Sequence, residues 1–228
     1  MEGSMPLRKF PILVILLTTM WAVAPAKSTD PVPPPNYPFG DVPPQTLNHH
    51  PALSMTLGPL NVRLIGTNLK EVQKVIGSGE IHARGDAAEN TRWLCYSNSD
   101  KEYSWRVWLM SNGEMDKPEG RISTIVAKIL AESESIPSCP VLPPMFGVVV
   151  LNNGIWLNAT QVDVLKKLGE PSLRKDSWFL YGGEQRVRND PRAKAWRGKD
   201  WIEIGVLSLR FQSGKLVELW ATISEDAE

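Results

Sequence analysis

Apolar residues recur at helical spacing in the segment 160–171, with capping residues at both of its ends. Val164, Leu165 and Leu168 form one apolar stripe, which is typical of an amphipathic helix. Thr160 is a suitable N-cap, because its hydroxyl can accept an amide hydrogen of the first turn. Gly169 can adopt the left-handed conformation that ends a helix. The pattern therefore predicts a short helix between Thr160 and Gly169.

The same order of signals occurs upstream. Asn68 and Glu71 have the spacing of a capping box, and Gly77 follows the helical stripe. The stripe consists of Leu69, Val72, Val75 and Ile76. After each predicted helix a Trp-x-x-Tyr motif opens a strand, at residues 93–96 and 178–181. We interpret the shared order as an internal duplication of about 75 residues per unit. The alternative is two unrelated pieces that share common turn residues.

Alternating and apolar runs predict further strands. They lie at residues 62–65, 103–110 and 122–129, then at 148–151, 155–157, 202–211 and 216–223. A helix is the alternative for residues 125–133. The predicted fold class is α+β, with two tandem repeats that each pack a short helix on a small antiparallel sheet.

The N-terminal residues 1–26 have the pattern of a secretory signal peptide. Arg8 and Lys9 precede an apolar run, and small residues end at Ala26. We expect cleavage near Ala26, a periplasmic or secreted mature protein, and no stable membrane anchor. The alternative is a retained anchor.

Two proline-rich stretches separate the predicted units. They cover residues 27–56 and 136–147, so repeat 1 spans 57–135 and repeat 2 spans 148–228. Because prolines favour an extended polyproline conformation, we interpret both stretches as linkers. The alternative for the first stretch is a ligand for the aromatic groove of a partner.

Charge and cysteine content narrow the possible functions. The chain has 25 basic and 25 acidic side chains, and removal of Arg8, Lys9 and Glu2 with the signal leaves a net charge of −1. Such a balance provides no overall field to attract nucleic acid. Cys95 and Cys139 are the only cysteines, and an exported chain favours a disulfide between them. Two buried thiols are the alternative.

Catalytic patterns are missing from the sequence. It has no Gly-x-Ser-x-Gly motif and no phosphate-binding glycine loop. His82 is the only histidine inside a predicted unit, and His49 and His50 lie in a linker. We therefore predict a protein that is not an enzyme, with no metal site and no cofactor.

Tryptophan suggests binding instead. Nine Trp occur in the chain, of which one lies in the signal segment. Trp93 and Trp178 recur in the two units, so we assign both to structure. Strand alternation places Trp220 with Glu218 and Thr222 on an open sheet face, and Trp108 lies on a similar strand. Both are candidate partner-binding residues. The alternative is that the linkers cover this face.

Residues 182–200 form a predicted polar insertion. Arg186, Arg188 and Arg192 lie in it with Trp196, and these residue types are favoured in interfaces. The insertion therefore predicts binding to a protein with an acidic surface. A solvated loop is the alternative.

A family resemblance rests on residues 153–171, on the strand at 178–181, and on the closing strand pair around residues 211–216. These segments resemble exported bacterial modules that include the beta-lactamase inhibitor protein and the SmpA/OmlA-type outer-membrane lipoproteins. The resemblance implies helices on one face of an antiparallel sheet and a free face for protein binding. The lipoprotein cysteine is absent here, and only one disulfide can form.

The sequence thus predicts a non-enzymatic exported protein-binding module. Inhibitor or immunity-type action against an enzyme or toxin is the favoured subtype. The alternatives are a structural factor in envelope or outer-membrane assembly, and a small hydrolase whose site is assembled from distant residues.

Overall fold

The computed structural model describes residues 31–39, 51–86, 90–99, 103–112, 120–131, 139–147, 149–188 and 200–227. The elements in chain order are β1 (Ser54–Leu57), β2 (Leu60–Arg63), α1 (Leu69–Ile76), β3 (His82–Arg84), β4 (Thr91–Ser99), β5 (Ser104–Asn112), β6 (Thr124–Ile129), a short 3-10 helix (Pro144–Phe146), β7 (Val149–Leu151), α2 (Gln161–Leu168), β8 (Leu173–Lys175), β9 (Trp178–Arg188), β10 (Asp200–Gln212) and β11 (Lys215–Ala227). No helix in this described part is long and apolar enough to cross a membrane.

Both α-helices begin and end at their predicted caps. The Asn68 side chain accepts a hydrogen bond from the Glu71 amide at 2.8 Å, and the Asn68 amide donates one to the Glu71 carboxylate at 3.1 Å. Thr160 Oγ1 accepts from the Asp163 amide at 3.1 Å. Gly77 and Gly169 each have a φ of 76°, which L-amino acids with side chains rarely adopt. Local capping chemistry therefore determines both helices.

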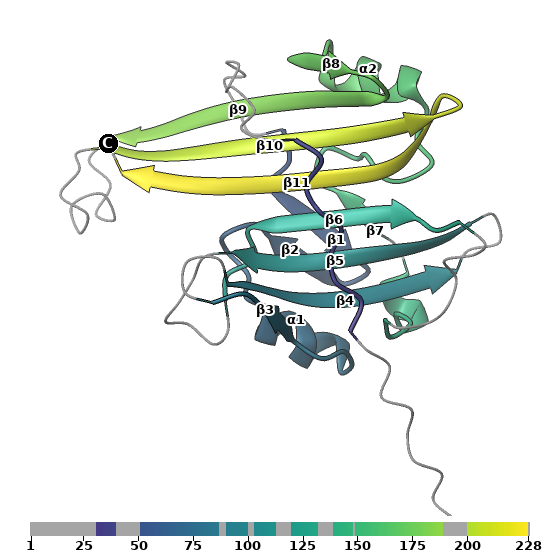
Figure 1. The fold of residues 1–228 in the computed structure, drawn as a ribbon, viewed down its shortest axis with the longest axis vertical. Coiled ribbons are helices and arrows are strands. Elements are labelled where there is room, and N and C mark those ends of the chain that lie inside the picture. Colours follow the sequence, from purple (N-terminus) through teal and green to yellow (C-terminus); the bar gives the residue numbers. More distant parts are fainter. Residues whose placement is uncertain are drawn as a thin grey trace, which may run out of the picture.

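Eight antiparallel strands form the main sheet, in the order β3-β4-β5-β6-β11-β10-β9-β8 (Figure 1). Its centre is the pairing of β6 with β11, where Thr124 lies opposite Thr222 and Lys128 lies opposite Glu218. Strands β9, β10 and β11 extend well beyond β6 towards the end marked C in Figure 1. We call the extended part, residues 182–188, 200–206 and 222–227, the ribbon.

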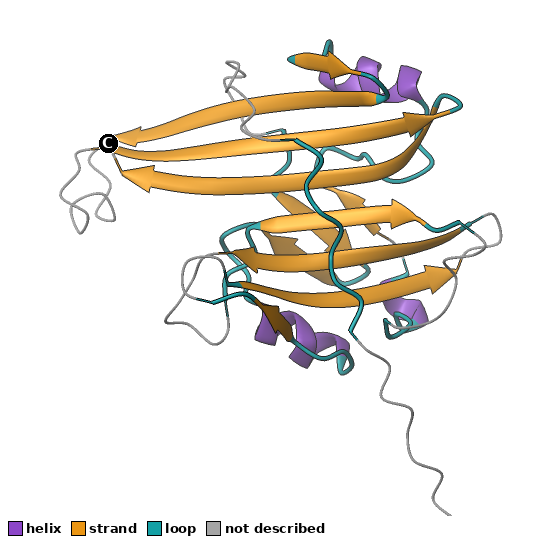
Figure 2. Cartoon of the chain, viewed as in Figure 1, coloured by secondary structure: helices purple, strands orange, loops and turns teal. Residues whose placement is uncertain are grey.

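The inner face of this sheet packs on a second sheet of three strands, in the order β2-β1-β7. One continuous core joins the two sheets and both helices, and it includes Met55, Leu57, Leu69, Tyr96, Leu109, Leu151, Val164, Tyr181 and Leu219. The helices lie at opposite ends of the strand order, α1 next to β3 and α2 next to β8 (Figure 2). Val75, which belongs to the predicted apolar stripe of α1, is instead 51% exposed.

Two buried tyrosines connect the sheet to the segments that follow the helices. Tyr96 Oη donates a hydrogen bond to the Ser78 carbonyl at 2.8 Å. Tyr181 Oη donates to the Gly169 carbonyl at 3.1 Å. Each phenol thereby satisfies a backbone acceptor beyond the end of a helix, where intrahelical partners are missing.

The predicted fold class, two helix-on-sheet repeats, is wrong. The protein is mostly β, and among the described residues two α-helices accompany one eight-stranded and one three-stranded sheet. The pairing of β6 with β11 removes two sheet edges that would otherwise be exposed. In addition, β7 from the second predicted unit pairs with β1, which begins inside the predicted linker 27–56. Pairing between distant strands therefore joins the two predicted units through both sheets.

Candidate functional site

The outer face of the eight-stranded sheet carries side chains in cross-strand rows, because strand residues alternate between the two faces. The strand register defines three rows. The charged row is Arg106, Lys128, Glu218 and Arg210; the aromatic row is Trp108, Val126, Trp220 and Ser208; the hydroxyl row is Met110, Thr124, Thr222 and Val206. The sheet thus presents three chemically distinct stripes to the segment that crosses it.

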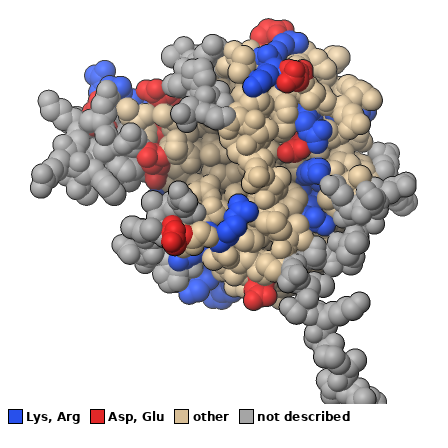
Figure 3. Space-filling view, viewed as in Figure 1, with Lys and Arg blue, Asp and Glu red and all other residues tan. Residues whose placement is uncertain are grey.

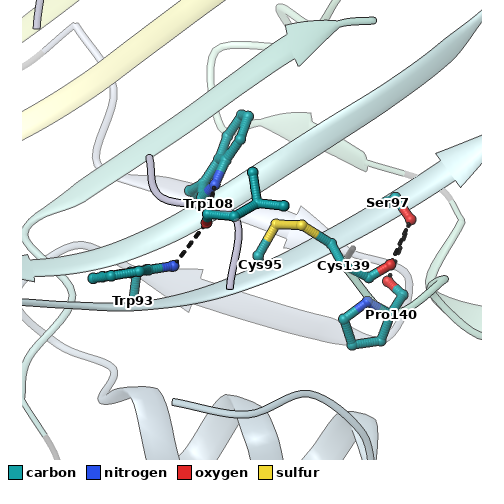
Figure 4. The surroundings of a disulfide bond; sticks show 7 residues. Trp93, Cys95, Ser97, Trp108, Cys139 and Pro140 are labelled. Atoms are coloured by element: carbon teal, nitrogen blue, oxygen red, sulfur yellow. Dashed lines mark hydrogen bonds between the residues drawn. A yellow bond between two sulfur atoms is a disulfide. The ribbon is translucent and has the colours of Figure 1, made fainter. Parts of the chain in front are cut away.

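That segment is residues 31–39, which we call the strap. It runs across the outer face in an extended form without helix or strand (Figure 1). At its start the Val32 carbonyl accepts hydrogen bonds from Trp93 Nε1 at 3.0 Å and from Trp108 Nε1 at 3.4 Å. Figure 4 shows the Trp93 and Trp108 indoles near the disulfide of Cys95 and Cys139. Indole donors on a proline-rich backbone are typical of polyproline recognition.

The far half of the strap is held by aromatic rings. Tyr37 Oη shares a hydrogen bond with Ser208 Oγ at 3.0 Å, and the Tyr37 ring lies edge-on to Trp220 at 5.2 Å between centroids. Phe39 contacts Trp178 in the same manner at 5.3 Å. The strap therefore crosses the sheet from β4 and β5 to β9 and β10.

Trp108 and Trp220 lie on the outer face, as their alternation predicts, but each is only 3% exposed. The alternative interpretation of the sequence therefore describes this structure, because a stretch of the predicted linker covers both indoles. Their assignment as partner-binding residues stays a prediction, and a partner could reach them only after the strap moves.

Glu218 fixes the position of the Trp220 indole. Its carboxylate accepts Trp220 Nε1 at 2.9 Å and two guanidinium hydrogens of Arg210 at 2.8 and 3.0 Å. Glu218 is only 8% exposed, so the forked Arg210 pair offsets the cost of burying its charge. The charged row thus holds the aromatic row in one orientation.

The disulfide predicted between Cys95 and Cys139 is present. It lies beside Trp108, which is opposite Cys95 in the strand register. Ser97 of β4 also binds the Cys139 segment. Its hydroxyl donates a hydrogen bond to the Cys139 carbonyl at 3.0 Å, and its amide donates one to the Pro140 carbonyl at 2.9 Å. Figure 4 shows how the disulfide and these bonds secure the Cys139 segment against β4, next to the start of the strap.

A cavity of about 640 Å³ opens between the strap and the sheet. Its described lining residues are Pro35, Asn36, Tyr37, Phe39, Arg84, Met110, Asn112, Thr124, Ile204, Val206, Trp220, Thr222 and Ser224. Most of the described surface on this face is uncharged, with separate small groups of basic and acidic side chains (Figure 3). The cavity is therefore a candidate binding site in the described part of the chain.

The described residues of the predicted insertion 182–200, namely 182–188 and 200, are strand. Residues 182–188 of β9 pair with residues 200–206 of β10, so the hairpin continues where the sequence suggested a loop. Arg186 and Arg188 are exposed on the outer face of the ribbon, and Arg186 Nη1 lies 3.8 Å from Asp200 Oδ2. Arg192 and Trp196 lie outside the described residues. Ile204 lines the cavity and pairs with Glu184, which lies two residues before Arg186 in β9. The cavity thus lies next to the part of the ribbon that holds Arg186 and Arg188.

Sequence reasoning missed the contribution of Tyr37 and Phe39. They lie among the prolines of the predicted linker, where the proline content suggested a spacer. The sequence could have indicated that these residues are packed, because two aromatic side chains in a solvated spacer would expose apolar surface to water. A proline-rich stretch that contains aromatic residues is therefore a candidate for docking onto its own chain.

Burial raises the pKa of three tyrosines, so we expect alkaline destabilisation. The pKa of Tyr37 lies above its ordinary value of 10.0 because of desolvation, although the Ser208 hydrogen bond acts in the opposite direction. Desolvation raises the pKa of Tyr181 to about 12, against the opposing effect of Arg174, and it also raises that of Tyr96. Unfolded phenols ionise near pH 10 while the folded ones keep their protons, so the unfolded state binds fewer protons there.

Below pH 10 the phenols are protonated in both states, so their ionisation does not reduce the free energy of unfolding. This free energy should fall as the pH rises from 10 towards 12, where only the unfolded phenols ionise readily. Urea unfolding at a series of pH values measures this fall. Tyr96→Phe should reduce its slope. A free energy of unfolding that stays constant across this window would contradict the burial of the phenols.

The described residues contain no group of three or more His, Cys, Asp or Glu able to hold a metal ion. His82 packs near the Trp93 ring, at 5.7 Å between centroids. The predicted absence of an enzyme activity, a metal and a cofactor stays a prediction. No protein-family model, curated protein or solved structure matches this chain, so the resemblance to exported inhibitor and lipoprotein modules also stays a prediction from sequence.

Proposed function

We propose that this chain is a non-catalytic, exported protein-binding module whose contact surface is the outer face of the ribbon. The carrying observation is the exposure of Arg186 and Arg188 beside the partly buried side chains of Ile202 and Ile204. Arginine next to aliphatic surface is characteristic of protein interfaces, because the guanidinium can pair with carboxylates while the aliphatic groups are desolvated. An acidic protein surface is therefore the expected partner.

Two observations support the export and binding parts of this proposal. A disulfide persists in oxidising compartments such as the periplasm or the exterior of the cell, and this chain has one. The described cavity residues carry hydroxyl, amide and guanidinium groups but no carboxylate or imidazole. Such a set binds and orients a ligand, whereas acid–base catalysis needs a proton acceptor near the reacting atom.

Inhibitor or immunity-type action is the subtype that this architecture favours. The ribbon continues three hydrogen-bonded strands of the main sheet, and the strap and Glu218 brace the strands at its base. A surface that is already rigid loses little conformational entropy on binding, so more of its contact energy appears as affinity. This property suits a protein that blocks a partner by occupying its surface.

Charge reversal of the ribbon tests the proposal. The double variant Arg186→Glu and Arg188→Glu should lower the affinity for the partner about tenfold or more, mainly through slower association. The loss should be larger at low than at high ionic strength, because salt screens exposed charges. Partner candidates are first captured on the immobilised mature protein from exported-protein extracts. Their binding to the purified variants is then measured by surface plasmon resonance.

Lys166→Glu on α2 is the matched control, since it reverses an exposed charge away from the ribbon. Equal affinity of the wild type and the ribbon variant would place the interface elsewhere. A captured enzyme or toxin whose activity falls at stoichiometric addition supports the inhibitor subtype. Capture of envelope-assembly proteins, without such inhibition, favours the structural role instead.

A further inference from the structure

We propose that the cavity between the strap and the sheet binds a small, mostly apolar molecule that carries one carboxylate. Ile204, Val206, Thr222 and Ser224 line this site and also belong to the ribbon, whereas Arg186 and Arg188 are not among its described lining residues, and the site does not depend on a protein partner. The cavity volume of about 640 Å³ lies within the range of small-molecule sites, which is roughly 300–1,000 Å³.

The apolar part of the ligand is specified by the walls. Met110 and Val206 bound the hydroxyl row at its two ends, and Thr124 and Thr222 lie between them on β6 and β11. Tyr37 and Phe39 of the strap and Trp220 of the sheet add aromatic surface. A hydrocarbon chain or ring that enters this space exchanges water for apolar contacts on both the floor and the strap side.

The polar end of the ligand is specified by charge. Arg84 is the only formally charged residue among the described residues that line the cavity. Strand pairing places Arg84 at the cavity, because Arg84 lies opposite Thr91, and Thr91 lies opposite Asn112, which also lines the cavity. Within the described part of the lining, no carboxylate competes for the guanidinium or would attract a cation. Arg84 is exposed to solvent at the edge of the cavity, and its guanidinium can form two parallel hydrogen bonds with a carboxylate.

A neighbouring hollow of about 330 Å³ shares Asn112, Thr222 and Ser224 with the cavity, but its charge is balanced. Arg121 and Glu225 line it and form an ion pair at 3.3 Å. Because its guanidinium already has a carboxylate partner, this hollow does not select an anion. The contrast assigns the anionic group of the ligand to the side of the cavity that holds Arg84.

Three ten-carbon probes separate the contributions of the apolar part and the charge. Isothermal titration calorimetry of the full mature protein is carried out with decanoate, 1-decanol and decylammonium, each below its aggregation concentration. Decanoate should bind with a one-to-one stoichiometry, 1-decanol roughly tenfold more weakly, and decylammonium more weakly still. No binding of decanoate, or equal binding of all three probes, would overturn the inference.

Variants then place the binding in the cavity. Thr222→Trp fills the floor and should abolish decanoate binding, and Val206→Trp is the second filling variant if the first does not fold. Arg84→Gln should reduce decanoate affinity roughly tenfold, to the level of 1-decanol, and leave 1-decanol binding unchanged. Arg63→Gln, on the exposed side of β2, is the matched control and should change neither.

Circular dichroism and urea unfolding confirm that each variant is folded. A folded filling variant that still binds decanoate at wild-type affinity would place the site elsewhere. An Arg84→Gln variant with unchanged decanoate affinity would refute the anionic class of ligand. Because the ribbon arginines lie outside the cavity lining, the ribbon charge-reversal variant should bind decanoate normally, which separates this inference from the proposed protein-binding function.

Discussion

Replacing Trp220 by alanine is expected to lower the free energy of unfolding by about 3–5 kcal/mol, the range for removing a large buried aromatic side chain. The indole is 3% exposed and packs edge-on against Tyr37 at 5.2 Å. Its Nε1 also donates to Glu218, so alanine leaves a nearly buried carboxylate with one donor fewer. Urea unfolding with the disulfide intact measures the loss. Limited proteolysis should at the same time show faster cleavage within the strap.

Trp220→Phe separates the two causes. It keeps a ring against Tyr37 but removes the donor to Glu218, so the expected loss is about 1–3 kcal/mol. A Trp220→Ala variant within about 0.5 kcal/mol of the wild type would contradict the packed strap, because only surface substitutions are usually so mild. This result also matters for binding studies, since a loss of partner affinity in Trp220→Ala can arise from a displaced strap.

Removal of the disulfide is expected to have a similarly large effect. The double variant Cys95→Ser and Cys139→Ser should lower the free energy of unfolding by about 4 kcal/mol, because the bond closes a loop of 44 residues and restricts the unfolded chain. Urea unfolding of the variant and of the oxidised wild type gives the difference. The reduced wild type is the matched control and should resemble the double variant.

Two free thiols in the denatured, unreduced protein would contradict this bond directly. The local consequence is equally testable, since Cys95 lies opposite Trp108 and Trp108 donates to Val32 in the strap. Without the disulfide the start of the strap should become more accessible to proteases. Wild-type protection of the strap in the serine variant would show that Trp93 and Trp108 hold it unaided.

Local chemistry allowed several features to be predicted from sequence. The ends of both α-helices follow from Asn68, Gly77, Thr160 and Gly169, because capping involves residues only a few positions apart. The disulfide follows from the presence of only two cysteines in a chain with a predicted signal. Alternation also placed Trp108 and Trp220 on the face opposite the main core, since side chains of a strand change face at every residue.

The candidate site could be predicted only in part. Trp220 does line the cavity, and Arg186 and Arg188 lie on the adjoining ribbon. The sequence did not indicate that Arg84 would reach the same space, because β3 arrives there through its pairing with β4 and the pairing of β4 with β5. Nor did it indicate that residues 182–188 continue a hairpin, since their polar composition resembles that of a loop.

The sequence by itself determined the helix ends, the strand faces and the disulfide, because each depends on neighbouring residues or on a unique pair. The tertiary structure alone decided that β6 pairs with β11, that β7 pairs with β1, and that the strap covers the aromatic row. These contacts join residues far apart in the chain, such as Tyr37 and Ser208, which are separated by 171 positions. Their stability comes from closing sheet edges and burying aromatic surface, and both effects exist only after the distant segments have come together.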